Sequence, residues 1–187
     1  MSELLTIEQR VRRLEDRAEI RELVSRYGFV IDDRDVDGIA DLFATDATFR
    51  SQDAVLGARG RDAIINQFHQ RFSVLGMTHH FTHDHIIAFD DDDHAHGLVS
   101  SHAELVRNGV PMLVALRYAD KYVREDGRWR FADRFLTFCY YLDVRQYADL
   151  LTQRKRMRAY EEPRDADWPE GTPTWQAYQP PRSGRSG

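Results

Sequence analysis

Apolar side chains recur at every third or fourth position along the first part of the chain, and charged side chains fill most of the positions between them. This spacing brings the apolar side chains to one face of an α-helix, so the pattern predicts a long amphipathic helix over residues 4–31. Thr6 and Gln9 have the spacing of a capping box, which would fix the start of this helix.

Long segments rich in β-branched and aromatic residues fill much of the second half of the chain. Turn sequences separate them, and Asn108-Gly109 is a strong hairpin signal. The pattern predicts strands over residues 78–89, 95–106, 112–124 and 128–141. Between the first helix and these strands it predicts a short helix over 39–43, a strand over 47–50 and a helix over 61–75.

Helices followed by hairpin-linked strands are the order of an α+β fold. We expect a cone-shaped, curved antiparallel sheet wrapped around a pocket that the N-terminal helices close. Residues 1–145 would form this domain, and residues 146–160 would form a C-terminal helix. Prolines gather in residues 161–187, so this extension is expected to have no core of its own.

Charge and composition exclude several classes of function. The net charge is −5, which gives no overall basic signature for nucleic acid. No apolar run approaches the roughly 20 residues that a membrane-spanning helix needs. The N-terminus lacks the pattern of a signal peptide, so a cytoplasmic location is expected. The single cysteine, Cys139, excludes an intramolecular disulfide.

Three polar residues form a candidate catalytic set. Tyr27 and Asp32 lie at the end of the predicted first helix, and His80 lies in the predicted strand over 78–89. An imidazole can take a proton near neutral pH, since its ordinary pKa is about 6.5. Asp32 would fix the tautomer of His80 and stabilise the imidazolium that forms. Tyr27 would donate a hydrogen bond to an oxygen that gains negative charge.

Each of these residues also has a purely structural explanation or a rival. Asp32 could cap the helix that follows it, and Asp33 is the nearest alternative carboxylate. Tyr27 occupies an apolar helical position and could be a core residue. His79 is the alternative imidazole, and strand alternation places it on the opposite face from His80.

Four segments of the chain are similar to the SnoaL-like families of the nuclear-transport-factor-2-like superfamily, which includes scytalone dehydratase, bile-acid 7α-dehydratase and hexachlorocyclohexane dehydrochlorinase. They are Ile20–Tyr27, Asp32–Phe43, Asp46–Phe49 and Asp120–Trp129. The resemblance covers about residues 5–145. It implies a cone-shaped α+β fold and a dehydratase- or dehydrochlorinase-like lyase that needs no cofactor.

The resemblance also implies roles for single residues. Tyr27, Asp32 and His80 match the tyrosine, helix-end aspartate and strand histidine of the bile-acid dehydratase, and the dehydrochlorinase shares the last two. An arginine in the last strand of the dehydrochlorinase makes Arg134 a candidate for stabilising negative charge, although Arg134 could simply pair with a carboxylate. A second histidine in scytalone dehydratase makes His102 a candidate, although His102 could be a hydrogen-bonded core residue.

Other functions remain open from the sequence. The same acid–base residues would suit a double-bond isomerase or a cyclase, and the pocket could also belong to a non-catalytic binding or oligomerisation module. The histidine pairs His83-x-His85 and His94-x-His96 could each present two metal ligands on one strand face. His94 and His96 adjoin the acidic turn Asp90–Asp93 and are expected to be exposed, so we expect no functional metal.

The expected ligand is a small cyclic, polyketide-like or steroid-like molecule of apolar character. Aromatic residues in the last predicted strand favour a homo-oligomer, either a dimer or a trimer. Neither a nucleic acid nor a membrane is expected as a partner. The residues predicted to line the pocket are Phe29, Phe43, Phe49, Phe68, Phe72 and Met112.

Overall fold

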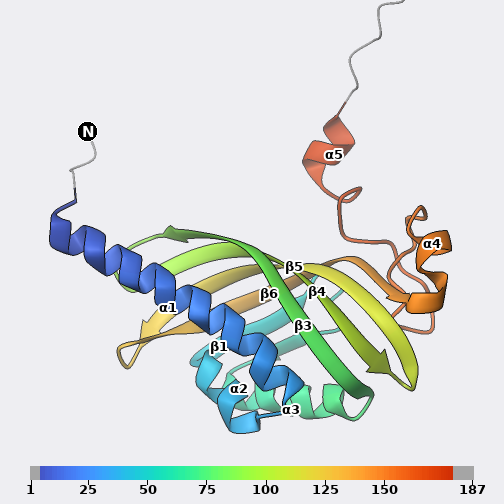
Figure 1. Cartoon of the computed structure of the whole chain (residues 1–187), viewed down its shortest axis with the longest axis horizontal. Coiled ribbons are helices and arrows are strands. Elements are labelled where there is room, and N and C mark those ends of the chain that lie inside the picture. The colour runs from blue at the N-terminus through green and yellow to red at the C-terminus, as the bar shows by residue number, and fades with distance from the viewer. Residues whose placement is uncertain (1–4, 179–187) are drawn as a thin grey trace, which may run out of the picture.

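The computed structural model describes residues 5–178 and shows an α+β fold (Figure 1). Two helices come first, and a third lies between the short β2 and the long strands. The order of elements is α1 (Ile7–Asp32), α2 (Val36–Leu42), β1 (Phe43–Ser51), β2 (Gly57–Arg59), α3 (Arg61–Phe72), β3 (Leu75–Phe89), β4 (His94–Arg107), β5 (Val110–Glu125), β6 (Arg128–Asp143), a 3₁₀ turn (Val144–Gln146), α4 (Tyr147–Leu150) and α5 (Pro173–Ala177).

The strands form one curved sheet in the order β2-β1-β6-β5-β4-β3, which is not closed into a barrel (Figure 1). The predicted fold class is confirmed, with one difference in strand direction. β1 pairs with β6 in parallel, whereas the other pairs are antiparallel. Hairpins fix the directions of β3 to β6, but β1 and β6 are distant in the chain and no turn constrains their pairing.

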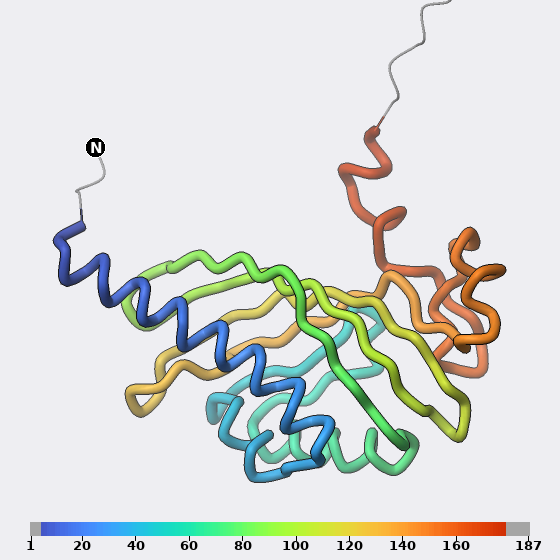
Figure 2. Tube along the Cα trace, viewed as in Figure 1, coloured from blue at the N-terminus to red at the C-terminus, as the bar shows by residue number. Residues whose placement is uncertain are grey.

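The first helix begins as predicted. Thr6 accepts a hydrogen bond from the backbone of Gln9 and donates its own backbone N–H to the Gln9 side chain, which completes the capping box. The second half of α1 buries its apolar face against β3 and β6. The first turns extend past the strands (Figure 2), and Ile7 and Leu14 there are 69% and 68% exposed. No helix of the described residues is long and apolar enough to cross a membrane.

The prediction of a C-terminal helix over residues 146–160 is wrong beyond Leu150. From there the chain runs back along the end of β6, where the Tyr141 backbone accepts from Arg158 and donates to the Arg156 carbonyl. Buried Arg156 forms an ion pair with Glu170 at 2.7 Å. These tertiary contacts outweigh the local helical pattern. They also hold part of residues 161–178, a region expected to have no core of its own, against the end of β6. Residues 179–187 of that region lie outside the described part.

Candidate active site

The end of α1 and strand β3 bring Asp32 and His80 into direct contact. Asp32 Oδ1 lies 2.6 Å from His80 Nδ1, and Asp32 Oδ2 accepts the backbone N–H of His80 at 2.8 Å. Both side chains are largely buried. The helix approaches the strand closely at Gly28, where an added Cβ would meet the His80 Cβ at 3.4 Å. One carboxylate therefore fixes both the backbone and the ring of His80.

This contact determines the chemistry of the imidazole. Because Asp32 is a carboxylate acceptor, Nδ1 carries the proton and Nε2 keeps a free lone pair. Burial opposes ionisation of Asp32, but hydrogen bonds from the ring and backbone of His80 outweigh it and hold the pKa of Asp32 below its ordinary value. In this neutral tautomer, Nε2 is the ring nitrogen of His80 that can accept a proton.

The rivals for these two positions lie elsewhere. Asp33 is exposed, and α2 is capped by Asp35, which accepts the backbone N–H of Gly38 at 2.9 Å. His79 borders an outer groove beside α1, and its ring lies 4.1 Å from that of Phe81. Among the described residues it is His80 that makes the imidazole contact with Asp32.

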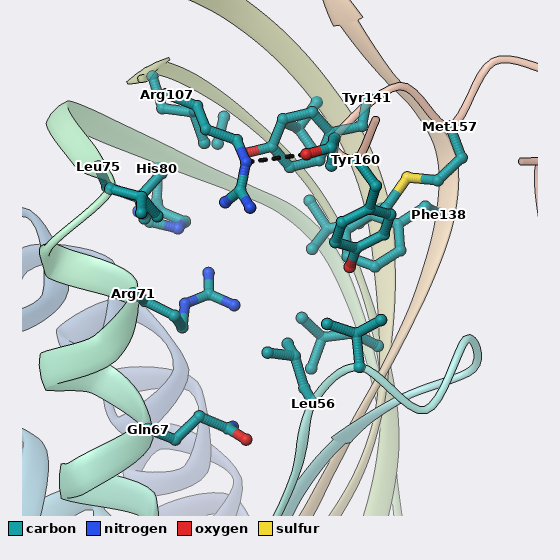
Figure 3. Close-up of a pocket in the computed structure, with 18 of the residues that line it drawn as sticks. Leu56, Gln67, Arg71, Leu75, His80, Arg107, Phe138, Tyr141, Met157 and Tyr160 are labelled. Atoms are coloured by element: carbon teal, nitrogen blue, oxygen red, sulfur yellow. Dashed lines mark hydrogen bonds between the residues drawn. The ribbon is translucent and has the colours of Figure 1, made fainter. Parts of the chain in front are cut away.

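His80 borders a cavity of about 300 Å³ between α3, the sheet and the C-terminal segment (Figure 3). Tyr27 and Tyr118 lie on its wall, and the ring centroids of Tyr27 and His80 are 6.0 Å apart. Gln67 and Arg71 point from α3 toward Phe138 and Tyr160 on the opposite wall (Figure 3). The other lining residues are mainly apolar and include Leu56, Leu75, Leu105, Val114, Leu116, Leu136 and Met157.

None of the six residues predicted to line the pocket lies on this wall. Phe43, Phe49 and Phe68 are fully buried and pack on one another. Phe72 lies under the Arg34 guanidinium, and buried Met112 is part of the core. Phe29 is 71% exposed and borders the outer groove. Periodicity marks these residues as apolar, but it does not separate solid core from cavity wall.

The SnoaL-like domain model matches residues 12–134, which are 123 of the 187 residues. The chain belongs to the SnoaL-like family. The matched range contains Tyr27, Asp32 and His80, whereas the cavity-lining residues Met157 and Tyr160 lie beyond it. No curated protein sequence matches the chain.

Solved structures share the fold at low sequence identity. A "Putative Scytalone Dehydratase" from Novosphingobium aromaticivorans is 22% identical, with a TM-score of 0.66, over 71% of this chain and 90% of that one. A hexachlorocyclohexane dehydrochlorinase, LinA-type3 from Novosphingobium barchaimii, is 21% identical, with a TM-score of 0.66, over 72% and 93%. A protein of unknown function from Mycobacterium tuberculosis is 26% identical, with a TM-score of 0.61, over 73% and 78%.

Arg134 of this SnoaL-like domain lies behind the cavity wall and not on it. Its guanidinium carbon lies 3.9 Å from the ring centroid of Tyr27 and 3.7 Å from that of Tyr118, and the side chain is fully buried. Its Nε lies 3.7 Å from Asp120 Oδ1. Burial raises the pKa of Tyr27, and the positive charge of Arg134 only partly offsets this. Tyr27 is therefore a neutral hydrogen-bond donor at physiological pH.

A second polar cluster, which the sequence did not reveal, lies beside this arginine. The Tyr122 hydroxyl donates to Asp120 Oδ2 at 3.1 Å and lies 3.0 Å from His85 Nε2. His85 turns inward because β3 contains a bulge: Thr82 pairs with Ser101 and His85 with Val99, so β3 has one more residue than β4 in this interval. Without this bulge, regular alternation along β3 would place His85 on the same face as His79.

The protonation of His85 should be visible in stability measurements. Burial, followed by the charges of Arg134, Arg21 and Arg17, lowers the pKa of His85 to about 4. The unfolded chain binds this proton near pH 6.5, so the free energy of unfolding falls as pH drops from about 6.5 to about 4. Between pH 7 and pH 4.5, urea titrations should show the free energy of unfolding of His85→Gln rising by about 1 kcal/mol relative to the wild type, less than the full pKa shift would give because His85 is only half buried.

The measurement must compare wild type with His85→Gln, because a second buried group, Asp120, also changes its protonation in this pH range. Burial raises the pKa of Asp120 to about 6, which favours the folded state on acidification and so opposes the effect of His85. Asp120 is present in both proteins, so its contribution largely cancels in the difference. Stability curves of wild type and His85→Gln that run parallel from pH 7 to pH 4.5 would show that His85 takes up its proton normally.

His102 lies away from the cavity. Its ring stacks on Phe81, and its Nδ1 lies 2.6 Å from His83 Nε2, beside the aromatic side chains of Tyr140 and Trp168. The strand partner of His80 is Ala103, which lines the cavity, so neighbouring His102 faces the other side of the sheet. It therefore cannot act on a molecule held beside His80.

The histidine pairs considered as metal ligands are also separated. His94 and His96 are exposed and contact Asp91 and Asp90 at 3.0 Å and 2.9 Å. The bulge sends His83 and His85 to different partners. Over residues 5–178, no group of three or more histidine, cysteine, aspartate or glutamate side chains is placed to hold a metal ion.

Proposed function

We propose that this SnoaL-like protein is a cofactor-independent lyase that removes water from a small cyclic substrate by β-elimination. The observation that carries the proposal is the 2.6 Å contact between Asp32 Oδ1 and His80 Nδ1 at the wall of a partly open cavity with mainly apolar lining residues. This contact leaves Nε2 of His80 free to act as a base toward a molecule bound in that cavity. Two structural neighbours are named as a dehydratase and a dehydrochlorinase, and both names support elimination chemistry.

The residues account for each proton in the reaction. Nε2 of His80 takes the proton from the carbon next to a carbonyl group, and the electron pair of that bond forms the new double bond. The C–O bond to the β-hydroxyl breaks, and protonated His80 returns its proton to the departing oxygen, so one water leaves. Tyr27 donates a hydrogen bond to the carbonyl oxygen as negative charge develops there. Asp32 stabilises the imidazolium between the two steps.

The cavity limits the substrate. About 300 Å³ is at the small end of ligand pockets, so a compact ring compound fits better than a steroid. The leucine and valine side chains on the wall suit its apolar body. The expected homo-oligomeric state and cytoplasmic location stay predictions. The exposed apolar side chains of Ile7 and Leu14 on α1 support an assembly of copies.

A product screen tests this function. Wild-type protein is incubated with cyclic β-hydroxy ketones and β-hydroxy thioesters, and products are read by mass spectrometry. We expect loss of 18 mass units, the mass of one water, from a substrate in this class. His80→Ala should abolish the product, whereas His79→Ala, at the exposed neighbour, should keep it.

The same screen separates the alternative reactions. A product of unchanged mass would indicate an isomerase or cyclase that uses the same base. Product formation that survives in His80→Ala would exclude the dyad mechanism. A protein that binds these compounds but converts none of them would be a binding module.

A further inference from the structure

Two arginines face the cavity, and neither forms an ion pair within the described residues. Arg71 comes from the last turn of α3 and Arg107 from the end of β4. Figure 3 shows both guanidinium groups pointing into the cavity on the side of His80. Within residues 5–178, no aspartate or glutamate lines this cavity, and no carboxylate lies within ion-pair distance of either arginine. The cavity therefore contains two positive charges without a counter-ion from the described chain.

Each arginine is held in place by contacts that leave its charge uncompensated. Arg107 Nε donates to the backbone carbonyl of Ala159 at 2.9 Å (dashed line in Figure 3), which leaves its two terminal nitrogens on the cavity side. Arg71 lies near Phe49 and Phe68, with its guanidinium carbon 5.9 Å and 5.8 Å from their ring centroids. Its Nε is buried without a hydrogen-bond partner among the described residues.

The other polar groups on the wall do not neutralise these charges. Burial raises the pKa of Tyr27, Tyr118 and Tyr141, and the nearby arginines offset this only in part. Their hydroxyls are therefore neutral at physiological pH. Two partly buried cations that share a small cavity repel each other and lose hydration, and an anion between them removes both costs. Planar guanidinium groups match the two oxygens of a carboxylate.

We propose that the substrate of this cavity carries a carboxylate, which Arg71 and Arg107 bind. The assignment of the cavity as a substrate site rests on the proposed function, and the inference names the substrate class: a compact cyclic β-hydroxy carbonyl compound with an apolar body that also carries a carboxylate. Leu75, Leu105 and Leu116 contact that body, and the two arginines fix its charged end. The substrate is amphipathic, not purely apolar, and its carboxylate determines which carbon lies against His80.

Paired acids and amides test the proposal without any turnover. Isothermal titration calorimetry compares benzoate, cinnamate and 2-naphthoate with their neutral amides, which have nearly the same shape. We expect at least one acid to bind roughly 30-fold or more tightly than its amide, the ratio for losing one partner of a desolvated charge pair. Arg71→Gln and Arg107→Gln should each remove most of this preference, and Arg71→Lys should retain part of it because the charge remains.

Arg117→Gln is the matched control. Arg117 also lacks an ion pair among the described residues, but it stacks on Trp168 at 4.0 Å and does not line the cavity. The Arg117→Gln substitution should leave the preference for the acid over its amide unchanged. Melting temperatures of all variants establish that each is folded. Inorganic phosphate is titrated in parallel, and phosphate binding tighter than every carboxylate would assign the site to phosphate esters and overturn the carboxylate proposal.

Binding and catalysis can fail separately. Asp32→Asn should bind the acid as the wild type does, because Asp32 does not line the cavity. An acid preference with no turnover of any β-hydroxy ketone or β-hydroxy thioester, with or without an added carboxylate, would support the anion site and exclude the lyase. Equal affinity for acid and amide, no binding of any acid at millimolar concentration, or a preference that survives in the Arg71→Gln/Arg107→Gln double variant would overturn the inference.

Discussion

Asp32→Asn is expected to lower kcat for elimination by about 10²–10⁴-fold while the protein stays folded. In the wild type, Oδ2 of Asp32 accepts the backbone N–H of His80, and Oδ1 faces His80 Nδ1. An asparagine would keep its oxygen on the backbone N–H and turn its NH₂ group to Nδ1. Nδ1 of His80 must then accept a hydrogen bond from this NH₂ group, so the ring proton moves to Nε2. The lone pair of Nε2 that would remove the substrate proton is then lost.

The tautomer can be measured without a substrate. Nitrogen-15 NMR of the His80 ring should show a protonated Nδ1 in the wild type and a protonated Nε2 in Asp32→Asn. Asp33→Asn, at the exposed neighbour, should keep both the wild-type tautomer and kcat. The loss of charge-assisted hydrogen bonds should also cost about 1–3 kcal/mol of stability. An unchanged kcat in Asp32→Asn would show that Asp32 has only a structural role, in which it joins the end of α1 to β3.

The stability contribution of Asp32 has a defined pH dependence. Its pKa is lowered in the folded protein, so the contribution is present above the pKa of the unfolded chain and is lost as pH falls through the folded value. The difference in stability between wild type and Asp32→Asn should therefore shrink in acid. Unfolding curves at pH 7 and pH 3 measure it.

Arg134→Met is expected to have the largest effect on stability, a loss of about 3–5 kcal/mol at pH 8. The substitution removes the cation that lies 3.7 Å from Asp120 Oδ1, and both side chains are fully buried. Asp120 would keep only the Tyr122 hydroxyl as a partner, since its Oδ1 has no hydrogen bond among the described residues. Stacking of the guanidinium on Tyr27 and Tyr118 would also be lost.

A double variant separates the charge effect from lost packing. Arg134→Met/Asp120→Asn should recover a large part of the stability, because it leaves no uncompensated charge in the core. The single variant should also be less destabilised at pH 5 than at pH 8, since protonation neutralises Asp120 there. Arg145→Met, at an exposed ion pair with Asp143, should have no measurable effect. A double variant no more stable than Arg134→Met would assign the loss to packing.

Local pattern determined much of this protein. The three- and four-residue spacing of apolar side chains placed α1 correctly, and Thr6 and Gln9 marked its start. Hairpin signals such as Asn108-Gly109 placed the four long strands and their antiparallel pairing. These features depend on residues close together in the chain, so the sequence alone contains them. Asp32 and His80 were also named from the sequence, through residue chemistry and resemblance to the SnoaL-like families.

Tertiary structure decided which side chains share a surface. A single extra residue in β3 turned His85 toward buried Tyr122, and strand alternation placed His102 on the face opposite His80. Docking of the C-terminal segment on β6 replaced a predicted helix and supplied Met157 and Tyr160 to the cavity. Arg71 and Arg107, from distant elements, became neighbours of one cavity. Such contacts join residues far apart in the chain, and their energies depend on packing and burial, which local periodicity does not specify.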